Sequence, residues 1–286
     1  MKGRIIIIMD FAYPSLDDFL LAALREDIGT GDVTTNSCVP VNAVSKGFFK
    51  TKEPGIVCGL FVAKRVFELL DNSIRFSPCS SDGDFVETGC VIAEISGPSR
   101  CILTGERTAL NLLQHLSGVA TRTAEAVKAI SGTKARIVDT RKTTPGLRLL
   151  DKYAVRCGGG SNHRFNLSDG ILIKDNHIAA AGGITNAVRF ARNNCPFTVK
   201  IEVETETPVQ VEEALAAGAD IIMFDNMTIE EMAAAVKKIG GLALTEASGN
   251  MGERDLRAVA GTGVDYISIG ALTHSVKSLD ISLKFG

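Results

Sequence analysis

Positively charged side chains and histidines are concentrated in one segment, residues 139–177. The segment reads DTRKTTPGLRLLDKYAVRCGGGSNHRFNLSDGILIKDNH and contains Arg141, Lys142, Arg148, Arg156, His163, Arg164, Lys174 and His177. The whole chain has a formal net charge of −2, so solubility does not require this concentration of cations. Arginine binds carboxylates and phosphates through a planar fork of donors, and lysine binds them as a point charge. The segment therefore predicts a site that holds several anionic groups at once.

Six short β-rich runs in the second half of the chain each end on a polar residue or a glycine. These end residues are Asp139, Lys174, Glu204, Asp225, Ser248 and Gly270. Helical patterns over 185–194, 208–217, 228–239 and 253–260 separate the later runs, which recur about every 22 residues and predict a parallel βα repeat. Polar groups at the carboxyl ends of many strands favour a barrel, because a doubly wound sheet gathers them at one switch point.

Gathered on one rim, the strand ends offer three kinds of chemistry. The groups for binding carboxylates and phosphates are Arg141, Lys142, His163, Arg164 and Lys174. Glu204 and Asp225 are acceptors suited to Mg²⁺ or to sugar hydroxyls. The small residues of 247–250 and 269–272 expose backbone N–H groups, which in barrels often bind phosphate after the last strands. The residues alone therefore predict a barrel enzyme that handles a phosphorylated sugar and a multiply anionic partner, with Mg²⁺.

Other interpretations stay open at this point. The cations and acids at the strand ends can form ion pairs with one another that have no function in binding or catalysis. Lys174 at a strand end also fits a Schiff-base aldolase, although such a lysine needs burial or a cationic neighbour to become nucleophilic. The glycines at 158–160 fit either a plain loop or a close backbone approach to a ligand. No serine–histidine–acid arrangement and no GxGxxG motif is present, which disfavours hydrolases and dinucleotide binding, and a non-enzymatic binding protein has little use for six polar strand ends.

The first part of the chain predicts a mixed α/β domain without chemistry of its own. A helix is expected from Ser15, strands within 44–58, a helix over 60–70 and a hairpin over 82–97. A long helix is expected from Thr104 to Ile130, with Gly118 as its candidate break. Arg107 then falls in the first turn, where a cation is unfavourable against the helix dipole. We interpret it either as an exposed arginine or as a residue that reaches a phosphate or a partner.

Length and composition bound the class of protein. A chain of 286 residues with 45% apolar and 22% charged residues has ample material for a barrel and a smaller domain. Its near-neutral charge argues against a nucleic-acid partner. Seven cysteines without a CxxC pair predict reduced thiols in a cytoplasmic protein. The apolar start MKGRIIIIM is too short for a secretion signal, and no run approaches the ~20 apolar residues of a membrane span.

Motifs along nearly the whole chain carry a specific resemblance. In order they are EDIGTGDVTT, GERTALNLLQHLSG, DTRKTTPGLRLLDKYAVRCGGGSNHR, IKDNHI, KIEVE, FDN, EASGN and GVDYISIGALTHS. With them the chain resembles the quinolinate phosphoribosyltransferase family. The resemblance implies an open, TIM-like α/β barrel of six to seven strands with an N-terminal α/β sandwich domain. The expected domains are 1–112, completed by the tail 275–286, and 113–274.

The resemblance also implies a reaction and the residues that perform it. Quinolinate and phosphoribosyl pyrophosphate would give nicotinate mononucleotide, CO₂ and pyrophosphate in NAD synthesis, with Mg²⁺ bound by Glu204 and Asp225. The residues expected to act in catalysis are Lys142, Lys174, Glu204 and Asp225. The residues expected to bind substrates are Arg107, Thr140, Arg141, Lys142, His163, Arg164, Lys174, Glu202, Glu204, Asp225, Ser248, Gly249, Asn250, Ile269, Gly270 and Ala271. Strand alternation places Glu202 and Glu204 on one face, with Glu204 nearer the rim.

Within that set, the expected tasks divide between two substrates. Arg141, His163, Arg164 and Lys174 would surround the quinolinate carboxylates, while the loops at 248–250 and 269–271 would hold the 5′-phosphate. An oxocarbenium-like step at the ribose C1 would precede decarboxylation, for which no dedicated acid–base residue is expected. The family resemblance further implies a homodimer or larger assembly in which Arg107 enters the neighbouring subunit's site. A paralogous enzyme with a different acceptor is the nearest rival, and the carboxylate-binding set argues against it.

Overall fold

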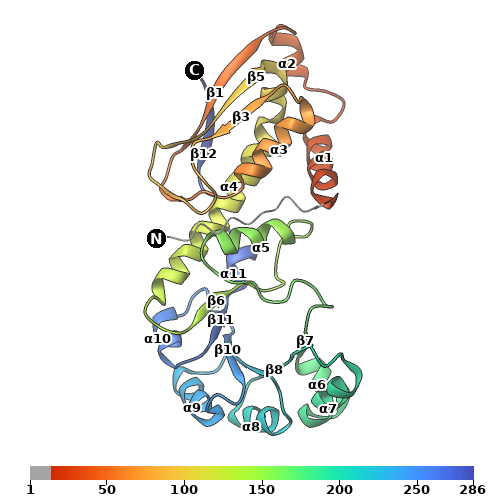
Figure 1. Ribbon diagram of the computed structural model, residues 1–286, viewed down its shortest axis with the longest axis vertical. Helices are drawn as coiled ribbons and strands as arrows, with labels where there is room; N and C mark the ends of the chain where they lie inside the picture. The colour runs from red at the N-terminus through yellow and green to blue at the C-terminus, as the bar shows by residue number, and fades with distance from the viewer. Residues whose placement is uncertain (1–13) are drawn as a thin grey trace. The chain divides into compact units, whose positions relative to one another are not determined.

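The described residues, 14–286 of this computed structural model, form two compact units (Figure 1). The first unit comprises residues up to Gln114 together with 279–286, and the second comprises 115–278. The long helix α4 (Ser99–Ala129) crosses the boundary and contributes to both units. The apolar start, on which the argument against secretion depended, lies outside the described residues.

The first unit is built on a four-stranded antiparallel sheet in the order β12-β1-β5-β3. Its strands are β1 (Val44–Thr51), β3 (Arg75–Pro78), β5 (Val91–Pro98) and β12 (Ile281–Phe285). Its shorter helices are α1 (Pro14–Ile28), α2 (Val33–Cys38) and α3 (Leu60–Leu70). The side chains of Phe49, Phe67 and Phe76 pack against one another with ring centroids 5.5–6.3 Å apart. The last strand of the chain therefore completes the sheet formed near its beginning.

Two expectations for this part of the chain are wrong. The predicted hairpin over 82–97 is not formed, because β4 (Phe85–Val86) pairs with β2 (Gly55–Ile56) while β5 pairs with β1 and β3. The long helix begins at Ser99 rather than Thr104 and continues through Gly118 without a break. At Gly118 a Cβ atom would lie 2.3 Å from the Lys277 carbonyl oxygen, so this glycine permits close packing of a neighbouring segment.

The second unit is an open barrel of parallel strands, as predicted (Figure 1). Its six strands are β6 (Arg136–Val138), β7 (Ile171–Ile173), β8 (Ile201–Thr205), β9 (Ile221–Asp225), β10 (Leu244–Ser248) and β11 (Tyr266–Ser268). They run in the order β6-β11-β10-β9-β8-β7, and every pairing between them is parallel. A single parallel bridge between Val138 and Ser161 lies beside β6, in the position that a seventh strand would take. Among the described residues the two end positions do not pair, so the barrel remains open.

Helices α6 (Asp175–Ala181), α7 (Ile184–Asn194), α8 (Pro208–Ala216), α9 (Ile229–Ile239) and α10 (Leu256–Gly261) lie on the outer side of this sheet (Figure 1). The unit also contains α5 (Arg148–Cys157) and the short α11 (Ala271–His274). Local sequence explains the best-defined ends: Thr228 and Glu231 form a capping box at the start of α9, and Gly240 ends it in the left-handed conformation. None of the helices in residues 14–286 is long and apolar enough to cross a membrane.

Candidate active site

A cavity of about 360 Å³ lies at the carboxyl ends of the barrel strands; we call it the upper cavity. It is lined by Thr140, Arg141, Lys142, His163, Arg164, Leu172, Lys174, Glu204, Met223, Asp225, Glu246, Ser248 and Ser268. The predicted residues from five strand ends and from the segment after α5 thus come together in one place. This convergence follows from parallel strands, because their carboxyl ends meet on the same rim.

The cations of the upper cavity differ in how they are held. Lys174 Nζ lies 2.8 Å from Glu204 Oε2 and is the exposed partner of that pair. Arg141 Nε is buried and has no hydrogen-bond partner among the described residues. A buried donor without an acceptor is costly, so an anionic ligand at Arg141 would relieve that cost. Thr273 Oγ1 donates to the Lys142 carbonyl oxygen at 2.7 Å, which fixes the backbone from which the exposed Lys142 side chain extends.

The two glutamates of β8 occupy different positions. Glu204 and Asp225 both line the upper cavity, where each carboxylate is partly exposed. Glu202 is buried, and its Oε2 lies 3.1 Å from His163 Nε2. It lines a second cavity of about 370 Å³ that also contains Thr198, Lys200 and Tyr266; we call it the lower cavity. Glu204 is therefore the glutamate nearer the rim.

Two loops present unpaired backbone donors beside the strand ends. The N–H groups of Gly249, Asn250, Gly270 and Ala271 donate to no group in residues 14–286. Gly249 has φ +91°, and a Cβ atom there would lie 2.3 Å from Asn226 Oδ1, so only glycine fits. Ile269 departs from the predicted pattern: it is buried and its N–H donates to the Val138 carbonyl oxygen at 3.0 Å. It therefore has no backbone donor left for a phosphate.

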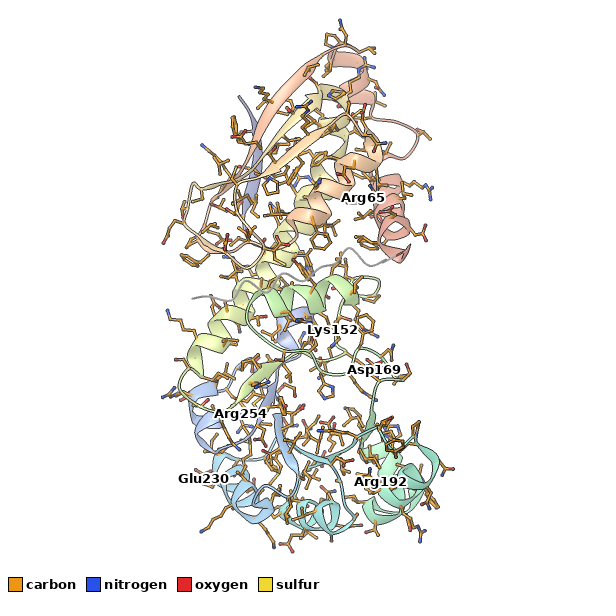
Figure 2. The ribbon with its side chains drawn as sticks, viewed as in Figure 1. Arg65, Lys152, Asp169, Arg192, Glu230 and Arg254 are labelled. Atoms are coloured by element: carbon orange, nitrogen blue, oxygen red, sulfur yellow. The ribbon has the colours of Figure 1, made fainter. Side chains whose placement is uncertain are left out.

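A buried ion pair that the sequence did not reveal holds the segment carrying His163 and Arg164. Lys152 on α5 (Figure 2) donates to Asp139 Oδ1 and to the His163 carbonyl oxygen. Asp139 also accepts from Asn162 Nδ2 at 2.6 Å and from the His163 N–H at 2.9 Å. The strand end at Asp139 thus serves as a structural anchor, and α5 is fastened to the site through it.

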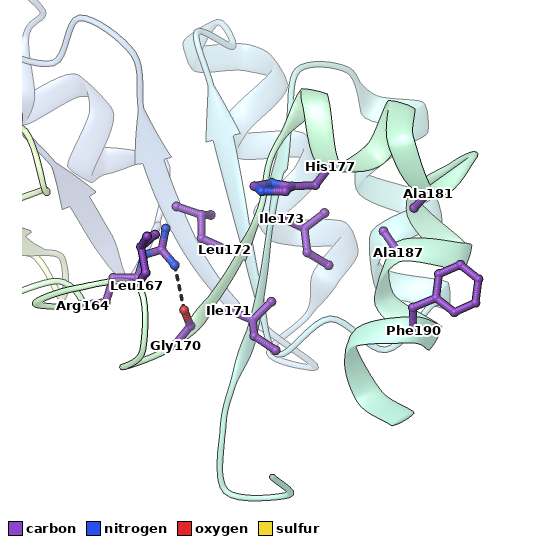
Figure 3. Close-up of a pocket in the computed structure, with 10 residues that line it drawn as sticks. All are labelled: Arg164, Leu167, Gly170, Ile171, Leu172, Ile173, His177, Ala181, Ala187 and Phe190. Carbon is purple, nitrogen blue, oxygen red and sulfur yellow. Dashed lines mark hydrogen bonds between the residues drawn. The ribbon is translucent and has the colours of Figure 1, made fainter. Parts of the chain in front are cut away.

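Arg164 lines three cavities, namely the upper one, the lower one and a third. Its Nη1 donates to the Gly170 carbonyl oxygen at 2.8 Å (Figure 3). The third cavity, of about 360 Å³, lies against β7, α6 and α7 and is lined mainly by apolar side chains such as Ile173 and Phe190. Burial, and next the charge of Arg141, lowers the pKa of Arg164. The two guanidinium groups therefore repel each other, and an anion between them would be favoured.

Several other residues of the cationic segment serve the fold. The glycines at 158 and 160 bring the end of α5 close to α4, since a Cβ at Gly158 would lie 2.4 Å from the Ala120 carbonyl oxygen. The close approach is thus to a helix and not to a ligand. His177 Nδ1 accepts from the Lys174 N–H at 3.0 Å and caps α6.

Arg107 belongs to the first unit, apart from the other predicted site residues. It is exposed on α4, and because that helix begins at Ser99 the residue does not lie in the first turn. The dipole argument for its unusual placement was therefore wrong. Its guanidinium makes no hydrogen bond within residues 14–286.

Comparison with known proteins links most of the chain to one family. Residues 32–117 match the model for the N-terminal domain of quinolinate phosphoribosyl transferase, and residues 119–284 match the model for its C-terminal domain. A probable nicotinate-nucleotide pyrophosphorylase [carboxylating] of Bacillus subtilis is 52% identical over 258 residues, covering 90% of this chain and 89% of the relative. The crystal structure of NadC from Streptococcus pyogenes is similar with a TM-score of 0.90 and 46% identity, covering 97% of this chain and 99% of that one. The nicotinate-nucleotide pyrophosphorylase structure from Francisella tularensis gives 0.91 and 43%, with 96% of each chain covered.

Proposed function

The chain belongs to the quinolinate phosphoribosyl transferase family, and from this premise we propose how its barrel performs the family's reaction. It is a carboxylating pyrophosphorylase: it transfers the phosphoribosyl group of phosphoribosyl pyrophosphate to quinolinate and yields nicotinate mononucleotide, CO₂ and pyrophosphate for NAD synthesis. The observation that carries the proposal is the upper cavity, which brings four cationic side chains together with the carboxylates of Glu204 and Asp225 and the buried Glu246.

The acid substrate lies on the cationic side of the upper cavity. Arg141 and Arg164 repel each other there, and Arg141 has an unused buried donor. Two substrate carboxylates supply the missing acceptors and offset the repulsion. Lys142 and Lys174 extend from the rim toward the pyrophosphate, and Thr140 lies beside them. The 5′-phosphate binds to Ser248 and to the backbone donors of Gly249, Asn250, Gly270 and Ala271, an arrangement typical of the last loops of a barrel.

Glu204 and Asp225 have a donor set that fits Mg²⁺. Each is partly exposed in the same cavity, and each keeps one carboxylate oxygen without a hydrogen bond among the described residues. Mg²⁺ prefers one or two carboxylates together with water and substrate oxygens. When bound, the ion neutralises negative charge on the departing pyrophosphate. The carboxylates also accept hydrogen bonds from the ribose hydroxyls.

The protein side chains contribute chiefly by position and charge. As the bond from the ribose C1 to pyrophosphate breaks, Lys142 and Lys174 stabilise the departing anion. The pyridine nitrogen of quinolinate, held by Arg141 and Arg164, attacks C1 from the opposite side. The new positive charge on that nitrogen withdraws electrons from C2, and the adjacent carboxylate leaves as CO₂.

A Schiff-base aldolase is disfavoured by the surroundings of Lys174. The ammonium is exposed and paired with Glu204, which stabilises the charged amine. A Schiff-base lysine needs the neutral amine. A relative with a different acid acceptor is disfavoured because the predicted carboxylate-binding cations, Arg141, Arg164 and Lys174, line one cavity together with His163.

The assembly and the compartment are also part of the proposal. We infer a homodimer or larger assembly in which Arg107 serves a neighbouring subunit, since its side chain is exposed and makes no hydrogen bond in residues 14–286. None of the seven cysteines forms a disulfide, which supports a reducing compartment such as the cytoplasm.

Incubation of the protein with quinolinate, phosphoribosyl pyrophosphate and Mg²⁺ tests the function directly. Nicotinate mononucleotide, CO₂ and pyrophosphate should form in equal amounts, and chelation of Mg²⁺ should stop all three. Replacement of quinolinate by nicotinate should give no product, because the second carboxylate is then missing. Folded protein that forms no product would contradict the proposal.

Replacing Glu204 by glutamine should lower turnover roughly 10²-fold, because an anionic ligand for the metal and the partner of Lys174 disappear together. Half-maximal activity should also require more Mg²⁺. The matched control is Glu206→Gln, since Glu206 is exposed on the same segment and does not line the cavity. Equal Mg²⁺ requirements for Glu204→Gln and wild type would contradict the metal assignment.

A further inference from the structure

Three titratable side chains form a buried cluster between the two barrel cavities. His163 Nε2 lies 3.1 Å from Glu202 Oε2 and 3.5 Å from Glu246 Oε2. Both glutamates are buried, and one oxygen of each has no hydrogen-bond partner among the described residues. Two ionised carboxylates so close together in a dry interior repel each other strongly. The cluster therefore favours holding an extra proton.

A hydrogen bond at Nδ1 of His163 indicates which group of the cluster holds the extra proton. The backbone N–H of Arg164 donates to His163 Nδ1 at 2.7 Å. Nδ1 therefore carries a lone pair, and the single ring proton is on Nε2. Burial lowers the pKa of His163. The hydrogen bond to Glu202 and the charges of both glutamates raise this pKa by more, so the net shift is upward. A second ring proton at Nδ1 would nevertheless face the Arg164 N–H. The extra proton therefore belongs on a carboxyl group.

Glu246 is the carboxyl group placed to hold it. Burial, and next the charge of Glu202, raises the pKa of Glu246 to about 8. The groups facing it are Glu202 and Glu204 from β8, His163 from the segment after α5, and Ser268 from β11. The His163 and Ser268 interactions lower its pKa and do not outweigh the other effects. Burial beside a second carboxylate thus favours the protonated, neutral form of Glu246.

The position of the cluster gives this acid access to both cavities. Glu246, His163 and Arg164 line the upper cavity, where the substrates bind, and also the lower cavity, which opens among residues at the amino ends of the strands. A group that faces both can donate a proton to one side and recover it from water on the other. The charged and hydroxyl groups of Lys200, Thr198 and Tyr266 line the lower side and provide hydrogen-bonding positions for that water.

We propose that Glu246 is the acid that protonates C2 of the pyridine ring after CO₂ has left, and that it is reprotonated through the lower cavity. The proposal rests on the proposed function, since it assigns a step of that reaction. The bond from C2 to the carboxylate carbon breaks and its electron pair stays on C2. C2 then takes the Glu246 proton, and the resulting carboxylate takes one proton from water. Cleavage itself still needs no acid or base, but the product needs this proton.

The isosteric substitution Glu246→Gln tests the step. Turnover should fall about 10²-fold, in the range of general acid catalysis, with KM for both substrates changed little. A C2 anion without a proton donor recaptures CO₂, so pyrophosphate release in the first turnover should exceed CO₂ release. Wild-type turnover should decline as the pH rises through about 8, because Glu246 must be protonated. Glu246→Asp should keep this alkaline decline, and Glu246→Gln should lose it.

The outcomes separate this proposal from the proposed function. If the wild-type protein makes no nicotinate mononucleotide, the proposed function itself is contradicted. If wild type is active and Glu246→Gln releases pyrophosphate and CO₂ in step, or keeps the wild-type alkaline decline, Glu246 is not the donor. The matched control is Glu230→Gln on the exposed surface of α9, which should leave every readout unchanged (Figure 2). If Glu246→Gln does not fold, wild-type turnover that stays flat to about pH 9.5 overturns the proposal.

Discussion

Replacing Lys152 by methionine should lower the free energy of unfolding of the barrel unit by about 3–5 kcal/mol, the usual effect of breaking a buried ion pair. Lys152 and Asp139 have side chains 4% and 0% exposed. Methionine keeps the length and packing of the lysine but leaves the Asp139 carboxylate buried without its counterion. Denaturant titration, followed in the transition of the barrel unit, measures the loss.

The pH dependence of this loss has a defined sign. Burial raises the pKa of Asp139, and the Lys152 charge is the largest influence that lowers it. In the variant the folded-state pKa therefore moves further above the unfolded value of 3.8. The penalty is fully present above that raised folded-state pKa and shrinks as the pH falls toward 3.8, because a protonated Asp139 needs no counterion. The deficit should be larger at about pH 8 than at about pH 5.

An exposed pair of the same residue types provides the control. Lys134 Nζ lies 2.7 Å from Asp265 Oδ1, but the lysine side chain is 58% exposed. Lys134→Met should therefore cost less than about 1 kcal/mol. The double substitution Asp139→Asn with Lys152→Met should recover part of the loss, since no buried charge remains. Equal losses at Lys134 and Lys152 would contradict the anchoring role of the buried pair.

The barrel was accessible from sequence because its signals are local and repeated. Each strand is a short apolar run with a polar end, and the spacing of those ends implies parallel strands whose carboxyl ends meet. Glu204 and Asp225 therefore share a cavity as expected. The family resemblance assigned roles to these residues, which spacing alone does not provide.

The remaining features depend on contacts between distant residues. Asp139 pairs with Lys152 across a loop and a helix turn, and no local pattern in the sequence marks either residue as buried. The strands at 85–86 and 91–98 join different sheets, although their alternation resembles one hairpin. Glu246 could have been found, since it lies two residues before Ser248 and strand alternation places both on the inner face. Its burial and its glutamate neighbour required the structure.

Replacing Arg107 by alanine should reduce turnover by about 10³-fold, because a substrate carboxylate would lose a charged partner in a desolvated site. Replacing Arg141 by alanine should have a similar effect for the same reason. Both variants should fold normally, since Arg107 is exposed and Arg141 has a buried donor that lacks an acceptor. Taken alone, these losses do not reveal whether the two arginines act in one chain or across two.

A mixture of the two variants answers that question. If Arg107 serves the neighbouring subunit, a dimer of one Arg107→Ala chain and one Arg141→Ala chain has one intact site and one doubly defective site. Random pairing of equal amounts makes half of the dimers mixed, so about a quarter of wild-type activity should return. If Arg107 acts within its own chain, every site carries one defect and no activity returns. The control mixture of Arg141→Ala with Lys174→Ala should stay inactive, because both residues line the same cavity of one chain. Recovery in the first mixture but not in the second would therefore show that each site is completed by a second copy of the chain.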